Sequence, residues 1–246
     1  MAVSHSALVT GASRGIGLGI ATRLAEQGYD LTITSRRQER LDEVASRLLA
    51  LGAHGVEQIA AEISNEDEIA RVIDAHSARF GGMSALVLAA GVGSAGPIAD
   101  YPLSRWDRQF AVNVRSAFFV IRQALPMLRK SAQDDPCGAR IIALGSIGGV
   151  YAEPNLAAYG AAKAALVSLC HSVNAEESAA GVSATAIAPA YVDTDMSAWV
   201  REQVPAESMI SVNDIVTLVV GILGLSARAV VSEIVVGRAG TSGYCA

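Results

Sequence analysis

Seven short runs of apolar and β-branched residues recur along the chain, separated by longer segments with helical periodicity. Strands that alternate with helices form βαβ units, and the strands of such units run parallel in one sheet. The predicted strands are residues 7–10, 31–34, 56–60, 85–89, 140–144, 183–187 and 233–236. The pattern therefore predicts an α/β fold: a single Rossmann-type, doubly wound parallel sheet of about seven strands with helices on both faces.

The length of the chain favours one domain over residues 1–246. No repeat or low-complexity linker divides it, and the polar stretch 131–138 is interpreted as a surface loop. The poorly patterned segment 190–212 contains Tyr191, Met196 and Trp199. It is interpreted as a substrate lid, with an ordinary packed loop as the alternative.

Two serines are predicted to begin helices. Ser104 is followed by Asp107 as in a capping box, and Ser64 precedes an acidic first turn. The helix after Ser104 is expected to bury an apolar face made of Phe110, Val114, Phe118 and Ile121.

The charge and hydropathy of the chain exclude several classes of partner. The net charge is −5 and the 19 basic residues are scattered, so neither a nucleic-acid partner nor a membrane-binding surface is expected. The apolar run 215–225 is too short to span a bilayer and is predicted to be a core helix. Residues 1–6 show no signal-peptide pattern, so we expect a cytoplasmic protein.

The three cysteines, Cys137, Cys170 and Cys245, lack metal-ligand spacing and are expected to be free thiols, with no metal site. Cys170 next to His171 raises the hypothesis of a cysteine-dependent acyl transferase. Adjacent residues on a helix point in different directions, however, so a buried structural cysteine is the favoured interpretation.

A glycine-rich turn follows the first predicted strand and opens a helix. Its sequence is Thr10-Gly11-Ala12-Ser13-Arg14-Gly15-Ile16-Gly17, with the spacing GxxxGxG. Glycines there allow close backbone approach to a pyrophosphate, and the helix offers unpaired N–H groups. The turn predicts a dinucleotide ligand, although glycine-rich turns of this kind also occur for structural reasons.

The end of the second strand indicates which dinucleotide. It ends with Ser35 and Arg36, without the carboxylate that usually binds a free ribose 2′-hydroxyl. We therefore expect NADP(H) to be favoured over NAD(H), with Arg36 and Arg14 binding the 2′-phosphate. Arg37 and Arg40 are expected to lie on a solvated helix face.

Tyr159 and Lys163 are four residues apart in a helical segment, which places an ammonium group beside a phenol. A nearby cation lowers a phenol pKa of about 10 by about 1–3 units. The pair therefore predicts a tyrosine that exchanges a proton with a substrate oxygen.

Together, the glycine turn, Ser146 thirteen residues before Tyr159, and Lys163 resemble the short-chain dehydrogenase/reductase family over essentially the whole chain. The 3-oxoacyl-carrier-protein reductase branch is the most similar in overall pattern. Asn113 matches the catalytic asparagine of the family, and the segment from Pro189 to Thr194 resembles its nicotinamide loop.

The resemblance implies a role for each member of the catalytic set. Tyr159 would protonate a carbonyl oxygen, Ser146 would hydrogen-bond that oxygen, and Lys163 would lower the tyrosine pKa and hold the ribose. Asn113 would position water in a relay to Lys163. The complete expected cofactor set is Gly11, Ser13, Arg14, Gly15, Ile16, Gly17, Ser35, Arg36, Glu62, Ile63, Ala90, Gly91, Tyr159, Lys163, Pro189, Val192 and Thr194.

The chain departs from the family pattern at four places. Leu88 and Ala89 replace an Asn-Asn pair, which removes an amide that ties neighbouring backbone together. Glu62 replaces an aspartate, Ala190 replaces a glycine, and residues 236–240 lack the common Asp-Gly-Gly ending. The first of these predicts relaxed stability or cofactor placement, and the last weakens the inference that the family's usual subunit contacts form there.

The leading functional hypothesis is an NADP(H)-dependent oxidoreductase acting on a carbonyl or alcohol, such as a 3-oxoacyl thioester or a small, partly apolar ketone. The alternative is a non-catalytic NADP(H)-binding regulatory protein of the same fold. The resemblance also implies a homotetramer or homodimer, built on the helices that begin near Ser104 and Leu156.

Overall fold

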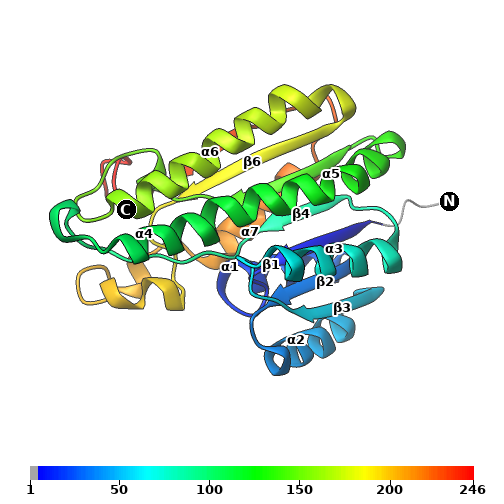
Figure 1. Ribbon diagram of the computed structural model, residues 1–246, viewed down its shortest axis with the longest axis horizontal. Helices are drawn as coiled ribbons and strands as arrows, with labels where there is room; N and C mark the ends of the chain where they lie inside the picture. The colour runs from blue at the N-terminus through cyan, green and yellow to red at the C-terminus, as the bar shows by residue number, and fades with distance from the viewer. Residues whose placement is uncertain (1–4) are drawn as a thin grey trace.

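The computed structural model describes residues 5–246, and its strands form one seven-stranded sheet in which every pairing is parallel. The strand order is β3-β2-β1-β4-β5-β6-β7 (Figure 1). The strands are β1 (Ser6–Thr10), β2 (Asp30–Ser35), β3 (Gly55–Ala60), β4 (Ala85–Leu88), β5 (Ala139–Leu144), β6 (Val182–Pro189) and β7 (Glu233–Val236). The predicted fold class is confirmed.

Helices cover both faces of this sheet. They are α1 (Gly15–Glu26), α2 (Gln38–Leu51), α3 (Glu66–Phe80), α4 (Leu103–Phe110), α5 (Ser116–Asp134), α6 (Ala157–Glu177) and α7 (Val212–Leu223). Residues of α1, α2 and α7 form one apolar core with the sheet, and residues of α3, α5 and α6 form the second. Figure 1 shows α3, α5 and α6 in front of the sheet with α1 and α7 behind it.

The position of β1 determines where a ligand can bind. β1 pairs with β2 on one side and with β4 on the other, so the chain connections leave β1 and β4 in opposite directions. A crevice opens at the carboxyl ends of the strands at such a switch point.

Both predicted serine caps are wrong. Asn65, rather than Ser64, caps α3, because its side chain accepts hydrogen bonds from the backbone N–H groups of Asp67 and Glu68. Pro102 precedes α4 with extended backbone, so Ser104 already lies inside the first turn and makes no cap.

The predicted loop 131–138 is also partly wrong, because α5 continues to Asp134. The Ser131 hydroxyl accepts a 2.8 Å hydrogen bond from the Met83 N–H, which fixes the last turn of α5 against the segment before β4. Only residues 135–138 connect α5 to β5.

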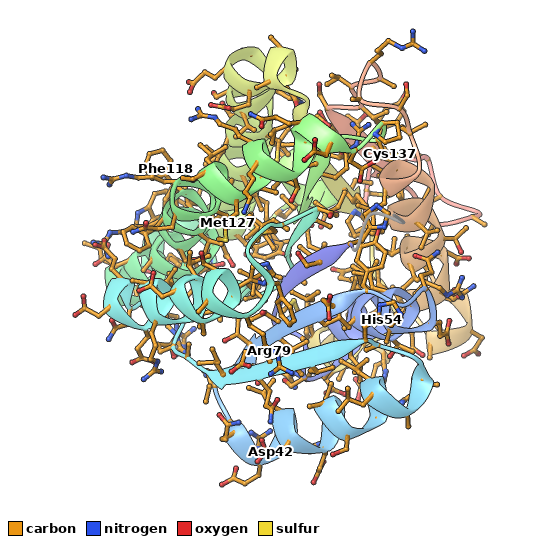
Figure 2. All side chains as sticks on the ribbon, turned by 90° about the vertical axis from the view of Figure 1, so that its right-hand side faces the viewer. Asp42, His54, Arg79, Phe118, Met127 and Cys137 are labelled. Carbon is orange, nitrogen blue, oxygen red and sulfur yellow. The ribbon has the colours of Figure 1, made fainter. Side chains whose placement is uncertain are left out.

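Phe118 does not join the buried face that helical spacing predicts. A π-helical turn, η2 (Ala111–Arg115), lies between α4 and α5 and adds a residue to the repeat. The buried face of α5 therefore includes Ala117 and Ile121, and Phe118 is 55% exposed. In Figure 2 the Phe118 side chain lies on the outer side of the molecule.

The structure also shows the location of the apolar run near the end of the chain. The apolar run 215–225 forms most of α7, as predicted, and no helix within residues 5–246 is long and apolar enough to cross a membrane. No group of three or more potential metal ligands occurs in the same range. Residues 1–4, on which the signal-peptide expectation partly rests, lie outside the described residues.

The cysteines are free thiols, as expected. Cys170 lies on the buried face of α6, and burial raises the pKa of its thiol to about 12. A thiol with that pKa is not ionised at neutral pH, which argues against the acyl-transferase hypothesis.

Candidate active site

One large cavity of about 1110 Å³ lies at the carboxyl ends of β1 to β6. Its lining includes every residue of the expected cofactor set, together with Ser146, Tyr159 and Lys163. Asn113 is the exception: it is buried just behind the wall and does not line the cavity. Residues from distant parts of the sequence therefore meet in one site.

The glycine turn fits a closely packed ligand loop. Gly11 has a φ of +67°, and a Cβ atom there would lie 2.8 Å from the Ala90 nitrogen. A Cβ atom on Gly17 would lie 2.5 Å from the Gly11 oxygen. Helix α1 begins at Gly15 and no side chain caps it, so its first N–H groups are available to an anion such as a pyrophosphate.

The Thr10 hydroxyl supplies the tie that the missing Asn-Asn pair removes. It accepts hydrogen bonds of 3.1 Å from the N–H groups of both Ala89 and Ala90, and it donates to the Val87 carbonyl at 3.3 Å. The loop after β4 is thereby held against the end of β1, while the expected effect on cofactor placement remains a prediction.

Asn113 holds the next part of the same loop. Its side-chain oxygen accepts from the Val92 N–H at 3.0 Å, and its amide nitrogen donates to the Val92 carbonyl at 2.8 Å. The π-helical turn η2 directs this side chain inward, where Asn113 is 2% exposed. The structure thus shows a positioning contact for Asn113, and the water relay to Lys163 remains a prediction.

Tyr159, Ser146 and Lys163 come together at the inner end of the cavity. Ser146 ends the segment after β5, and its hydroxyl hydrogen-bonds the Tyr159 phenol. Lys163, on the same face of α6 and one turn after Tyr159, places its ammonium nitrogen 5.7 Å from the centre of the phenol ring. The same nitrogen donates to the Leu144 carbonyl at 2.6 Å.

The electrostatics of this group differ from the sequence expectation. Burial raises the pKa of Tyr159, while its hydrogen bond to Ser146 acts in the opposite direction. Burial also lowers the pKa of Lys163 to about 8. The expected lowering of the Tyr159 pKa by Lys163 is therefore wrong for this structure, because both groups lose hydration and the ammonium points to Leu144.

The other end of the cavity fits the adenosine part of a nicotinamide dinucleotide. The Ser35 hydroxyl is buried there without a hydrogen-bond partner, so it is available to a ligand oxygen. Arg36 lines the same region, and so do Arg37 and Arg40, which sequence reasoning assigned to solvent. Arg37 and Arg40 are exposed, as expected, and their side chains also border the open rim of the cavity.

Arg14, which was expected to bind the 2′-phosphate together with Arg36, contacts the lid segment (residues 190–212) in this structure. Its guanidinium donates to Asp195 at 3.1 Å, and both side chains are well exposed. Exposed ion pairs of this kind stabilise a structure by less than about 1 kcal/mol, so Arg14 can exchange this partner for a ligand phosphate.

The lid segment has a fixed base and an exposed tip. Val192 forms an isolated parallel bridge with Ile210, and the Val192 carbonyl accepts a 2.7 Å hydrogen bond from Ser197. Tyr191 packs edge-on against Trp199, which is 62% exposed and still lines the cavity. The segment therefore contributes Tyr191, Met196 and Trp199 to the cavity, and its role as a lid remains a prediction.

Sequence reasoning missed several residues of the cavity wall. They include Arg105 and Arg108 on α4, Glu153 before α6, and Ala246. Glu153 lies between Ser146 and Tyr159, so its position in the chain was a usable signal. Nothing in the local pattern marks the other three.

Comparison with known proteins agrees with this geometry. Residues 5–205 match the short chain dehydrogenase family. The D-beta-hydroxybutyrate dehydrogenase of Rhizobium meliloti is 33% identical over 207 residues, which cover 84% of this chain and 77% of that protein. An uncharacterised oxidoreductase of Staphylococcus epidermidis is 34% identical over 78% of this chain and 79% of its own length.

Solved structures show the same fold over almost the whole chain. The RhlG/NADP active-site complex of Pseudomonas aeruginosa has a TM-score of 0.87 and 29% identity, covering 99% of this chain and 97% of that one. A variant of the actinorhodin polyketide ketoreductase with NADPH has a TM-score of 0.86 and 26% identity, covering 99% of both. The chain belongs to the short-chain dehydrogenase/reductase family and is a hydride-transfer oxidoreductase.

The lowered pKa of Lys163 gives a prediction that needs no substrate. Because its folded-state pKa is about 8, the side chain is charged below that pH and loses its proton as the pH rises through it. Labelling with ¹⁵Nζ-lysine gives two signals in an NMR spectrum, because Lys130 and Lys163 are the two lysines of the chain. The spectrum of the Lys130→Arg variant assigns them. We expect the Lys163 signal to titrate with a midpoint of about 8; a signal unchanged between pH 7 and 9 would contradict the burial argument.

Proposed function

We propose that the protein is an NADP(H)-dependent oxidoreductase that interconverts a carbonyl compound and its alcohol. The observation that supports this most directly is the meeting of Tyr159, Ser146 and Lys163 at the inner end of the dinucleotide-sized cavity. The same observation disfavours the regulatory alternative, which needs no such group.

The reaction follows from the chemistry of these side chains. Bound NADPH would supply a hydride to the carbonyl carbon. The Ser146 hydroxyl would hydrogen-bond the carbonyl oxygen, and the Tyr159 phenol would donate its proton to that oxygen as negative charge develops on it. Lys163 would hold the ribose hydroxyls of the cofactor and keep positive charge near the phenol.

The raised pKa of Tyr159 agrees with the reductive direction. A phenol whose pKa is raised stays protonated at neutral pH, so it begins the reaction as a proton donor. Reduction of a carbonyl consumes that proton, whereas oxidation of an alcohol requires the phenolate first.

Cofactor preference rests on the end of β2. The buried Ser35 hydroxyl without a partner and the arginines of α2 at the cavity favour a 2′-phosphate, and no carboxylate follows β2. Two structural neighbours described with NADPH or NADP support the same choice.

The substrate class rests on the lid segment and on the relatives. Tyr191, Met196 and Trp199 give the cavity an apolar wall, which favours a small, partly apolar ketone or a 3-oxoacyl thioester. The named relatives, a hydroxybutyrate dehydrogenase and a polyketide ketoreductase, both act on a hydroxyl or keto group by their names.

We further propose that the protein acts in the cytoplasm as a homodimer or homotetramer. A shallow apolar depression on the outer surface of α4, η2, α5 and α6 supports this assembly. It is lined by Phe110, Val114, Phe118, Ala165 and Leu169, among others. Helix α4 and η2 contact α6 directly, so the depression is continuous across these neighbouring helices on one face of the sheet.

Replacement of the tyrosine tests the reaction. Tyr159→Phe should lower kcat for NADPH-dependent ketone reduction by about 10²–10⁴-fold, because the proton donor is lost. The dissociation constant of NADPH, measured by nicotinamide fluorescence, should change little. Tyr29→Phe, which alters a partly buried tyrosine away from the cavity, is the matched control. Reduction that persists in Tyr159→Phe would show that the proton comes from elsewhere.

Replacement of Arg36 tests the cofactor preference. The wild-type protein should bind NADPH more tightly than NADH, and Arg36→Ala should weaken NADPH binding by about 10–100-fold through loss of a charge-assisted contact. NADH binding should stay nearly constant. Arg47→Ala, on the exposed side of α2, controls for a general change in charge. Tighter NADH binding by the wild-type protein would overturn the preference.

Replacement of Phe118 tests the assembly. Sedimentation of the wild-type protein at micromolar concentration should show a dimer or tetramer, and Phe118→Glu should shift it toward the monomer because a charge would be buried in the contact. Leu49→Glu on α2 is the control, since Leu49 is also exposed and lies outside this depression. A wild-type monomer would reject the assembly.

A further inference from the structure

The end of the chain folds back onto the active-site cavity. The Ala246 N–H donates to the Glu153 carboxylate at 2.5 Å, and a guanidinium nitrogen of Arg238 donates to an Ala246 main-chain oxygen at 3.1 Å. Figure 1 shows the red end of the chain near the beginning of α6, the helix that follows Glu153. Two side chains on different elements thus hold one terminal residue.

Further contacts fix the path of residues 241–246, which we call the terminal strap. Tyr244 packs edge-on against Tyr151, with ring centres 5.0 Å apart. The Thr241 hydroxyl donates to the Arg238 carbonyl at 2.9 Å. A Cβ atom on Gly237 would lie 3.3 Å from the Gly243 Cα, so the strap packs closely against the end of β7. Ala246 also contacts the apolar core beneath the sheet.

The strap reaches the part of the cavity where the reaction is proposed to occur. Ala246 and Glu153 line the cavity together with Tyr159 and Tyr191. Burial raises the pKa of Tyr191, Glu153 raises it further and Arg238 lowers it, so both anchors of the strap lie within electrostatic range of that ring. Tyr191 in turn raises the pKa of Tyr159 through charge repulsion.

The lid segment also lines this cavity, and its tip is more open than its base at Tyr191. Met196 is 49% exposed although it lines the cavity. In Figure 1 the lid segment and the terminal strap lie on opposite sides of the start of α6. A substrate carbonyl at Tyr159 would therefore have one substituent directed to the lid and the other directed to the strap.

We propose that the terminal strap, held by Glu153, Arg238 and Tyr151, is the end wall of the substrate pocket and limits the size of one substituent of the substrate. The preferred substrate is then a ketone, or the corresponding secondary alcohol, with one compact substituent toward the strap and a larger apolar substituent toward the lid. This inference rests on the proposed function, because it assigns the substrate class of the same site.

Specificity measurements test the wall. Arg238 does not line the cavity, so Arg238→Ala removes no direct contact with the substrate and loosens the strap. With a methyl ketone and a tert-butyl ketone that share one apolar substituent, the variant should raise the ratio of kcat/KM for the bulky over the compact ketone by about tenfold. The NADPH dissociation constant should stay within about twofold.

Two companion variants complete this measurement. Tyr244→Ala, which removes a contact of the strap outside the cavity, should change the ratio in the same direction. Arg228→Ala, an exposed arginine elsewhere in the last part of the chain, should leave it unchanged. An unchanged ratio in both strap variants overturns the proposal.

Hydrogen exchange separates failure of the wall from failure of the proposed function. The Ala246 amide, which is bonded to Glu153, should exchange about tenfold more slowly in the wild-type protein than in Arg238→Ala. Unprotected exchange in the wild type overturns the wall whatever the activity. Protected exchange without reduction of any ketone in the wild type rejects the proposed function and, with it, the substrate assignment, while the fixed strap stands.

Discussion

The active site depends on the hydroxyl of Thr10, which joins the ends of two neighbouring strands. It bonds main-chain groups of Val87, Ala89 and Ala90 and so holds the loop after β4 beside Gly11. The continuation of that loop is fixed by Asn113. This loop lies beside Gly11 at one end, and at the other a Cβ atom on Gly93 would lie 3.3 Å from the Tyr159 ring. The bonds of Thr10 and Asn113 therefore position both the dinucleotide part of the cavity and the part with the reacting side chains.

The same site concentrates groups whose burial disfavours their charged forms. Lys163 is 5% exposed and its pKa falls to about 8, while burial raises the pKa of Tyr159. Neither pKa shift stabilises the folded chain. The first brings the pKa of Lys163 closer to neutral pH, and the second keeps Tyr159 protonated at neutral pH. The surrounding cores on the two faces of the sheet hold these groups in place.

Much of the fold and part of the site were predictable from the residues. The seven strands, the buried Cys170 and the helix at 215–225 follow from local periodicity. The glycine turn could be placed because it lies between a predicted strand and a predicted helix. Predictions that depended on the exact position of a residue within a helical turn were wrong. The π-helical turn moved Phe118 to the surface, and Asn65 took the capping position from Ser64, because one residue of displacement changes the direction of a side chain.

The sequence by itself determined the parallel sheet, the family and the group Tyr159, Ser146 and Lys163, because these depend on short-range spacing and on residue chemistry. Only the tertiary structure decided the direction of the Tyr159 pKa shift, the contact of Arg14 with Asp195 and the position of Ala246 in the cavity lining. Hydration and long-range contact arise from how distant segments pack, and no local pattern of residues records either.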